Sequence, residues 1–182
     1  MKDLGVLLAP GAGADRDQAT LVALDRAFTA LGATVVRMDF PYRKAGRRAP
    51  DRAPVLIEAV CQEAAALPVR RLLLGGRSMG GRMCSMAVAE GLPAVGLLLV
   101  SYPLHPPGKP DSLRTEHFPT LSVPCLFVSG TRDTFGTPAE MESATAAIPG
   151  PVTHEWIEGK DHGLKGVDPR ICETATAWAS AL

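Results

Sequence analysis

The sequence predicts an α/β protein in which a six-stranded parallel sheet carries helices on both faces. Six short apolar runs alternate with stretches of helical periodicity along the chain, and this alternation is typical of parallel strands joined by right-handed crossovers. The length of 182 residues suits one domain, and 46% hydrophobic and 21% charged residues are ordinary values for a globular protein. No internal repeat or linker is visible, so we expect a single domain over residues 1–182.

The expected strands are short apolar runs, each bounded by polar residues, glycine or proline. They lie at Leu4–Ala9, Thr34–Met38, Leu72–Gly75, Val95–Val100, Cys125–Ser129 and Val152–Ile157. None approaches the roughly 18 apolar residues of a membrane span. Asp3 and Pro10 flank or interrupt the first apolar run in a way that argues against a signal peptide. We therefore expect no membrane association.

The helices are expected from apolar spacing and from their termini. The first has apolar residues at helical spacing, namely Leu21, Leu24, Phe28 and Leu31. Asp15 or Asp17 is expected to cap its start, and Gly32 to end it. The last helix is expected to start at Asp168 and to bury one apolar face, formed by Ile171, Ala175, Trp178 and Leu182.

Three more helices fill the gaps between the strands. One has Pro54 near its first position and Leu67 near its last. Another follows the third strand and runs over residues 82–90. The segment 137–140, Thr-Pro-Ala-Glu, is a capping box with proline at the first helical position, so a helix is expected to open there.

The segment between the fourth and fifth strands is expected to be irregular. Residues 101–124 contain six prolines and no apolar stripe long enough for a pair of helices. Because such a pair is what would form a lid over a site at this edge, we expect no lid.

A second loop, residues 40–52, is strongly basic. Its cations are Arg43, Lys44, Arg47, Arg48 and Arg52, against Asp51 alone. Most such runs are solvated loops. Because the loop follows a strand, it also lies at the edge where functional groups collect, so attraction of an anionic substrate is the alternative.

Overall charge and cysteine usage exclude several functions. The 19 basic and 19 acidic residues leave no net charge, so we expect no nucleic-acid partner. The cysteines fall singly within expected strands and helices, at Cys61, Cys84, Cys125 and Cys172. Without metal-ligand spacing, they indicate small buried apolar residues in a reducing compartment. We expect a cytoplasmic protein with no metal and no cofactor.

The segment 75–81, Gly-Gly-Arg-Ser-Met-Gly-Gly, joins the third strand to a helix. Gly76-x-Ser78-x-Gly80 fits the nucleophile elbow, a sharp turn that lifts a serine hydroxyl clear of a sheet. A strained backbone at such a turn needs neighbours without side-chain bulk, and glycine meets that need. Ser78 is therefore a candidate nucleophile, and a plain turn serine is the structural alternative.

Ser78, Asp133 and His162 each follow an expected strand, the third, fifth and sixth. Since the carboxyl ends of parallel strands share one edge of the sheet, these side chains are expected to meet. Asp161 and Asp168 also lie near strand ends and compete with Asp133. The other histidines, which lack this chain order, are His105, His117 and His154.

The phrases at 75–82, 130–133 and 161–163, with the order Ser…Asp…His, resemble the α/β-hydrolase superfamily along nearly the whole chain. The chain is most similar to its small dienelactone-hydrolase-like branch, and looks like compact domains that include testis-expressed and chromatin-complex-associated members. The resemblance implies Ser78 as nucleophile, His162 as general base and then acid, and Asp133 as the group that orients the imidazole.

The resemblance also implies an oxyanion hole of two backbone N–H groups. One would come from Met79, directly after the serine, and the other from Ala12 in the loop after the first strand. Pro10 stands where many relatives have histidine, so the support of that loop differs here. The residues expected to line a substrate pocket are Tyr102, His105, Phe40 and Tyr42.

The interpretation that follows is a serine hydrolase acting on a small ester or thioester through an acyl-enzyme. A small peptidase or amidase would use the same chemistry, although no added domain for holding a peptide is visible. A non-catalytic hydrolase-like binding scaffold is the alternative from another class, and fold alone does not decide between them. The expected partner is a small-molecule substrate, and the oligomeric state stays open.

Overall fold

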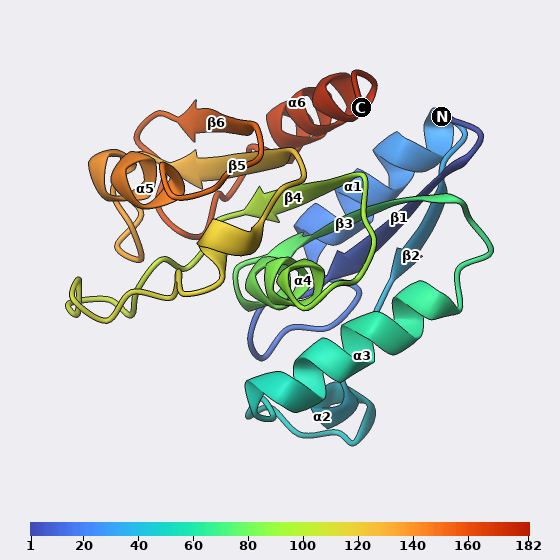
Figure 1. Ribbon diagram of the computed structural model, residues 1–182, viewed down its shortest axis with the longest axis horizontal. Helices are drawn as coiled ribbons and strands as arrows, with labels where there is room; N and C mark the ends of the chain where they lie inside the picture. Colours follow the sequence, from blue (N-terminus) through green and yellow to red (C-terminus); the bar gives the residue numbers. More distant parts are fainter.

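The computed structural model describes residues 1–182 and has the predicted α/β architecture (Figure 1). All strands are parallel, and their order in the six-stranded sheet is β2-β1-β3-β4-β5-β6. The strands are β1 Leu4–Ala9, β2 Thr34–Arg37, β3 Arg71–Arg77, β4 Gly96–Val100, β5 Cys125–Gly130 and β6 Val152–Ile157. β2 lies on one side of β1 and β3 on the other, so the topological switch point of the sheet lies between β1 and β3. The carboxyl ends of these two strands lie near the centre of one edge of the sheet.

Helices cover both faces of the sheet, as predicted. They are α1 Ala19–Ala30, α2 Pro41–Lys44, α3 Ala53–Ala65, α4 Met79–Ala89, α5 Pro138–Thr145 and α6 Asp168–Ala179, with a short 3₁₀ helix η1 at Phe118–Thr120. α1 and α6 pack on one face, and α3 and α4 on the other (Figure 1). None of these helices is both long and apolar enough to cross a membrane.

The core consists of two apolar layers separated by the sheet. Successive side chains of a strand point to opposite faces, so Leu97 and Leu99 join the layer with α3 and α4. Leu98 and Val100 join the layer with α1 and α6. A central parallel strand is therefore buried on both faces, which explains why these strands are continuous apolar runs rather than alternating ones.

The start of α1 differs from the prediction. Its N-cap is Gln18, with no side-chain cap, so neither Asp15 nor Asp17 caps the helix. Both carboxylates form ion pairs with other segments instead. Asp15 pairs with Arg43 at 3.1 Å, and Asp17 pairs with Arg37 at 2.9 Å. The capping box of α5 is confirmed, because the Thr137 side chain and Glu140 bond each other's backbone N–H groups.

The boundaries around Ser78 also differ from the prediction. β3 continues to Arg77 and α4 begins at Met79, three residues earlier than expected. The reason is that the chain turns within one residue, at Ser78, and Gly80 and Gly81 already belong to the helix. The nucleophile candidate is thus the single residue between strand and helix.

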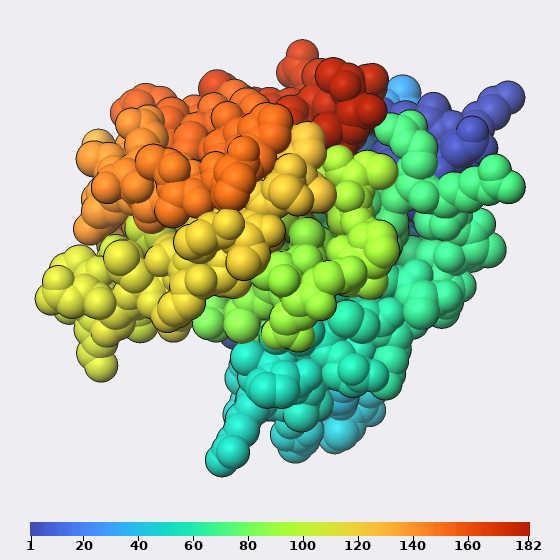
Figure 2. Space-filling view, viewed as in Figure 1, coloured from blue at the N-terminus to red at the C-terminus, as the bar shows by residue number.

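The segment after β4 carries no lid. Between β4 and β5 the only regular element is η1, in agreement with its proline content. Figure 2 shows the yellow-green part of this segment projecting at one end of the molecule in this view. The edge of the sheet that bears Ser78 is therefore not covered by a pair of lid helices.

Candidate active site

Ser78 has a backbone conformation that few residues other than glycine adopt. Its φ is 50° and its ψ −117°, and its N–H donates to the carbonyl oxygen of Val100 at 2.8 Å. A Cβ atom at Gly76 would lie 2.6 Å from the Ala9 carbonyl oxygen, and one at Gly80 would lie 2.2 Å from it. The two glycines are therefore required because the elbow presses directly against the end of β1.

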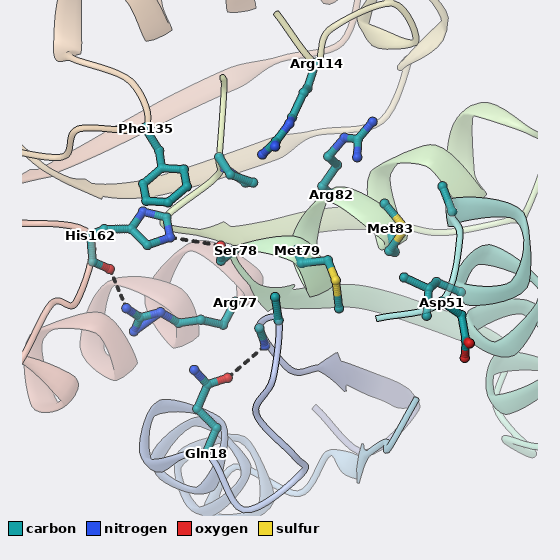
Figure 3. A pocket seen from close by; sticks show the side chains of 15 residues that line it. Gln18, Asp51, Arg77, Ser78, Met79, Arg82, Met83, Arg114, Phe135 and His162 are labelled. Carbon is teal, nitrogen blue, oxygen red and sulfur yellow. Dashed lines mark hydrogen bonds between the residues drawn. The ribbon is translucent and has the colours of Figure 1, made fainter. Parts of the chain in front are cut away.

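The structure brings Ser78, His162 and Asp133 together. His162 Nε2 lies 2.9 Å from Ser78 Oγ (Figure 3), and His162 Nδ1 lies 2.8 Å from Asp133 Oδ2. An ionised carboxylate can only accept, so Nδ1 carries the proton and Nε2 is left to accept the serine hydrogen. With this tautomer, a free lone pair of the imidazole points at the Ser78 hydroxyl.

Asp133 is held as a buried carboxylate. Its side chain is 2% exposed, and its other oxygen, Oδ1, accepts the Phe135 N–H at 2.8 Å. The Phe135 ring stacks on the His162 imidazole, with ring centroids 4.0 Å apart. The turn after β5 thus supplies both the hydrogen-bond partner and the packing partner of the histidine.

The rival carboxylates bond other groups. Asp161 accepts the Gly163 N–H, and Asp168 accepts the Thr20 hydroxyl. Neither contacts the imidazole of His162.

The rival histidines also lie away from Ser78. His105 is buried and lies 3.5 Å from a carboxylate oxygen of Glu140. His154 bonds Thr145 and stacks between Phe127 and Trp156, and His117 bonds Ser85.

Two residues that sequence reasoning did not assign hold the backbone of His162. The Arg77 guanidinium and the Ser101 hydroxyl both donate to the His162 carbonyl oxygen. Arg77 is 6% exposed and also approaches the Thr20 hydroxyl at 3.3 Å. Burial lowers the pKa of Arg77, although nearby carboxylates, first among them Asp168, act in the opposite direction. The signal in the sequence is a charged residue at the end of an apolar strand, next to the candidate nucleophile.

The turn directly after β1, residues 10–13, leaves one N–H free. The Gly11 N–H donates to the Gln18 side chain at 3.0 Å, and the Gly13 N–H donates to the Tyr42 hydroxyl at 3.1 Å (Figure 3 shows the first). Gly13 has a φ of 75°, which closes the turn. The N–H of Ala12, between these two, makes no hydrogen bond within the protein.

Met79 offers the second N–H group of the expected pair. As the first residue of α4, it has no acceptor one turn earlier within the helix. Met79, Ala12, Ser78 and His162 line one cavity of about 510 Å³. The positive end of the helix dipole also faces this cavity, so a developing negative charge beside Ser78 would be stabilised there.

The structure does not bring the four expected pocket residues to this wall. Phe40 and Tyr42 stack on each other in the core with ring centroids 6.2 Å apart, and the Tyr102 hydroxyl donates to the Arg114 carbonyl oxygen. His105 is buried beside α5. The rings of Phe40, Tyr42 and Tyr102 pack in the apolar core instead of facing the cavity. The other residues lining it are Gly11, Gln18, Asp51, Ala53, Leu56, Arg77, Arg82, Met83, Pro103, Arg114 and Phe135.

The cysteines lie outside this cavity, and all four are free thiols. Burial raises the pKa of the Cys84 and Cys125 thiols to about 12, and burial also raises the pKa of Cys61 and Cys172. Thiols in this state are poor nucleophiles at neutral pH. Among the nucleophilic side chains, Ser78 alone therefore has an adjacent base and lines the cavity.

Comparison with known proteins gives one family and many similar folds. The family described as "Alpha/beta hydrolase domain" matches residues 2–181. Est1E from Butyrivibrio proteoclasticus has a TM-score of 0.82 at 14% identity, covering 99% of this chain and 88% of that one. A protein of the alpha/beta superfamily from Xanthomonas campestris pv. campestris has a TM-score of 0.76 at 20% identity, covering 98% of this chain and 99% of that one. Dienelactone hydrolase from Anabaena variabilis has a TM-score of 0.72 at 18% identity, covering 96% and 84%.

Proposed function

Since the chain belongs to the alpha/beta hydrolase family, we propose that it is a serine hydrolase that cleaves a small ester or thioester. The observation that carries the proposal is the line of hydrogen bonds from Asp133 through His162 to Ser78. A serine hydroxyl is a weak nucleophile by itself, and this line supplies the base and the orienting carboxylate that it needs.

In the first step, Ser78 Oγ attacks the carbonyl carbon of the substrate while His162 Nε2 takes the hydroxyl proton. The carbonyl oxygen gains negative charge, and the N–H groups of Ala12 and Met79 are the donors available to it. Asp133 stabilises the imidazolium that forms, because its buried carboxylate bonds Nδ1.

In the second step, the bond between the carbonyl carbon and the leaving oxygen or sulfur breaks. His162 Nε2 returns the proton to the departing alkoxide or thiolate, which leaves an acyl group on Ser78. A water molecule then attacks the acyl carbon while the same imidazole takes its proton, and release of the acid restores the hydroxyl.

The proposal is tested by covalent labelling and by turnover. A fluorophosphonate probe should add once to the wild type, as seen by intact mass, and not at all to Ser78→Ala. Turnover of p-nitrophenyl acetate and butyrate should fall about 10³- to 10⁶-fold in that variant, because the substitution removes the nucleophile from a set of residues that act together.

The matched control is Ser143→Ala, a change at an exposed serine of α5, which should leave labelling and turnover unaltered. A wild type that is neither labelled nor active on any ester or thioester would contradict the proposal and favour a binding scaffold.

A further inference from the structure

Two arginines in the cavity have no partner within the protein. The side chains of Arg82 and Arg114 both line the cavity beside Ser78, yet neither makes a hydrogen bond or an ion pair. Both are half-buried, and Arg82 Nε is a buried atom without any hydrogen-bond partner. A guanidinium removed from water normally finds acceptors, so these two groups are unusual.

Arg82 and Arg114 line the same cavity, and their side chains lie near each other. Arg82 lies one helical turn beyond Ser78 on α4, where its N–H donates to the Ser78 carbonyl oxygen at 3.1 Å. Figure 3 shows the two side chains next to each other above Ser78 and Met79 in this view, with the Arg114 guanidinium on the side of Phe135 and the Arg82 guanidinium on the opposite side. Burial lowers the pKa of Arg114, and the charge of Arg82 acts in the same direction, which places the two cations within electrostatic reach of each other.

The position of Arg114 is fixed through its backbone. Its N–H donates to the Leu104 carbonyl oxygen at 2.8 Å, and its own carbonyl oxygen accepts the Tyr102 hydroxyl at 2.7 Å. The main chain is therefore anchored on both sides while the guanidinium stays unbonded. Anchoring the main chain lowers one part of the entropy lost when an anion binds.

Three other cations near this edge are neutralised. In the basic loop, Arg43 pairs with Asp15, Lys44 with Glu63 and Arg47 with Asp51, at 3.1, 2.8 and 2.8 Å. The structure thus favours the solvated-loop interpretation for these three cations. Asp51 is the one carboxylate that lines the cavity, and its charge is balanced by Arg47.

We propose that Arg82 and Arg114 form an anion subsite that binds a carboxylate or phosphate of the substrate within a few bonds of the scissile carbonyl. This inference rests on the proposed function and names its substrate class: a small ester or thioester with an anionic group on the acyl or the leaving side. Arginine matches both anions by paired N–H donors, and a half-buried site strengthens these bonds relative to water.

Two substrate pairs test the subsite and distinguish the side on which the anion lies. Mono-p-nitrophenyl adipate and its methyl ester differ by a carboxylate on the acyl side. 1-Butyrylglycerol 3-phosphate and 1-butyrylglycerol differ by a phosphate on the leaving side. In at least one pair, the wild type should hydrolyse the anionic member with a kcat/KM at least about tenfold higher than the neutral one.

The variants Arg82→Gln and Arg114→Gln should each lower kcat/KM for that anionic substrate about 10- to 100-fold, and alter the neutral partner less than about threefold. Arg82→Lys keeps the charge but loses the paired donors. Its kcat/KM for the anionic substrate should lie between the values of the wild type and of Arg82→Gln. The control is Arg48→Gln, an exposed arginine of the basic loop without an ion pair, which should leave both members unchanged. Thermal unfolding of each variant checks that it folds.

Binding without turnover separates this inference from the proposed function. Adipate or glycerol 3-phosphate at millimolar concentration should raise the Tm of the wild type and not that of Arg114→Gln. Ser78-dependent hydrolysis of neutral esters, with no preference for an anion and no Tm shift, would overturn the subsite alone. A Tm shift that depends on Arg82 and Arg114, without hydrolysis of any ester, would overturn the proposed function alone.

Discussion

The protein contains two serine–histidine pairs with nearly the same geometry. Ser78 Oγ lies 2.9 Å from His162 Nε2, and Ser85 Oγ lies 2.8 Å from His117 Nε2. The two serines lie two helical turns apart, one just before α4 and the other inside it. By distance alone, both pairs could be a nucleophile and its base.

The hydrogen bonds run in opposite directions in the two pairs. Asp133 accepts the Nδ1 proton of His162, so the other nitrogen accepts from Ser78. The Ser85 hydroxyl donates its one hydrogen to the Arg82 carbonyl oxygen at 2.8 Å, so His117 Nε2 must be the donor to Ser85.

The surroundings reinforce this difference. Ser85 is fully buried, whereas Ser78 lines the cavity. Burial lowers the pKa of His117 to about 4, and the positive charge of Arg82 acts in the same direction. The comparison teaches that the groups behind a serine–histidine pair, rather than the contact itself, make one pair chemically useful and the other structural.

Among changes to the groups behind the two pairs, removing the carboxylate behind His162 should have the largest effect. Asp133→Asn keeps the shape but offers an N–H₂ donor to Nδ1, which favours the wrong tautomer, so kcat should fall about 10³- to 10⁴-fold. Steady-state kinetics on a p-nitrophenyl ester measures this. Asp161→Asn is the matched control, since Asp161 bonds the Gly163 N–H and not the imidazole. An Asp133→Asn variant that keeps more than about a tenth of wild-type kcat would mean that the orienting carboxylate is not needed.

Loosening the backbone of His162 should have an intermediate effect. Arg77→Met removes one of two donors to the His162 carbonyl oxygen, and Ser101 remains. We expect a kcat about 10- to 100-fold lower with KM nearly unchanged, because a shifted imidazole impairs proton transfer rather than binding. Arg77→Lys should restore part of the loss. Equal changes in KM and kcat, or no rescue by lysine, would contradict a positioning role.

Changes to the second pair should affect activity least. Ser85→Ala and His117→Gln should leave kcat within about threefold of the wild type, since neither side chain lines the cavity. A loss of kcat as large as that of Asp133→Asn would mean that both serine–histidine pairs take part in catalysis.

The second pair should instead affect stability in acid. The folded pKa of His117, about 4, lies below the ordinary unfolded value near 6.5, so the unfolded chain binds the proton first as pH falls. The stability that neutral His117 contributes is therefore lost between about pH 6.5 and 4. His117→Gln should make urea unfolding less pH-dependent in this window, and His154, whose pKa burial also lowers, should account for part of what remains.

Much of the fold follows from short-range patterns. Short apolar runs predicted all six strands, and the four central strands are the most continuous of these runs because they are buried on both faces. The meeting of Ser78, Asp133 and His162 was also predictable, because strand ends in such a sheet share one edge. The N-cap of α1 was not predictable, because Asp15 and Asp17 form ion pairs with arginines that lie far away in the sequence.

The walls of the cavity could be predicted least. Tyr102 and Tyr42 have polar tips that suggest a pocket, but burial of their rings prevailed and those tips bond backbone groups. Arg114 lies in a segment without periodicity, so nothing local indicates where its side chain points. Arg77 acts on His162 through a backbone carbonyl, a contact that leaves no pattern in the sequence.

The placement of β6 has a consequence for how the protein loses activity. β6 is an edge strand that pairs only with β5, and the loop after it carries His162. Edge elements often open locally at a lower free energy than the whole sheet. Detachment of this edge on warming would carry the imidazole away from Ser78 while β1, β3 and β4 stay paired. Inactivation would then precede melting of the sheet, and return of activity on cooling would report the docking of the last strand.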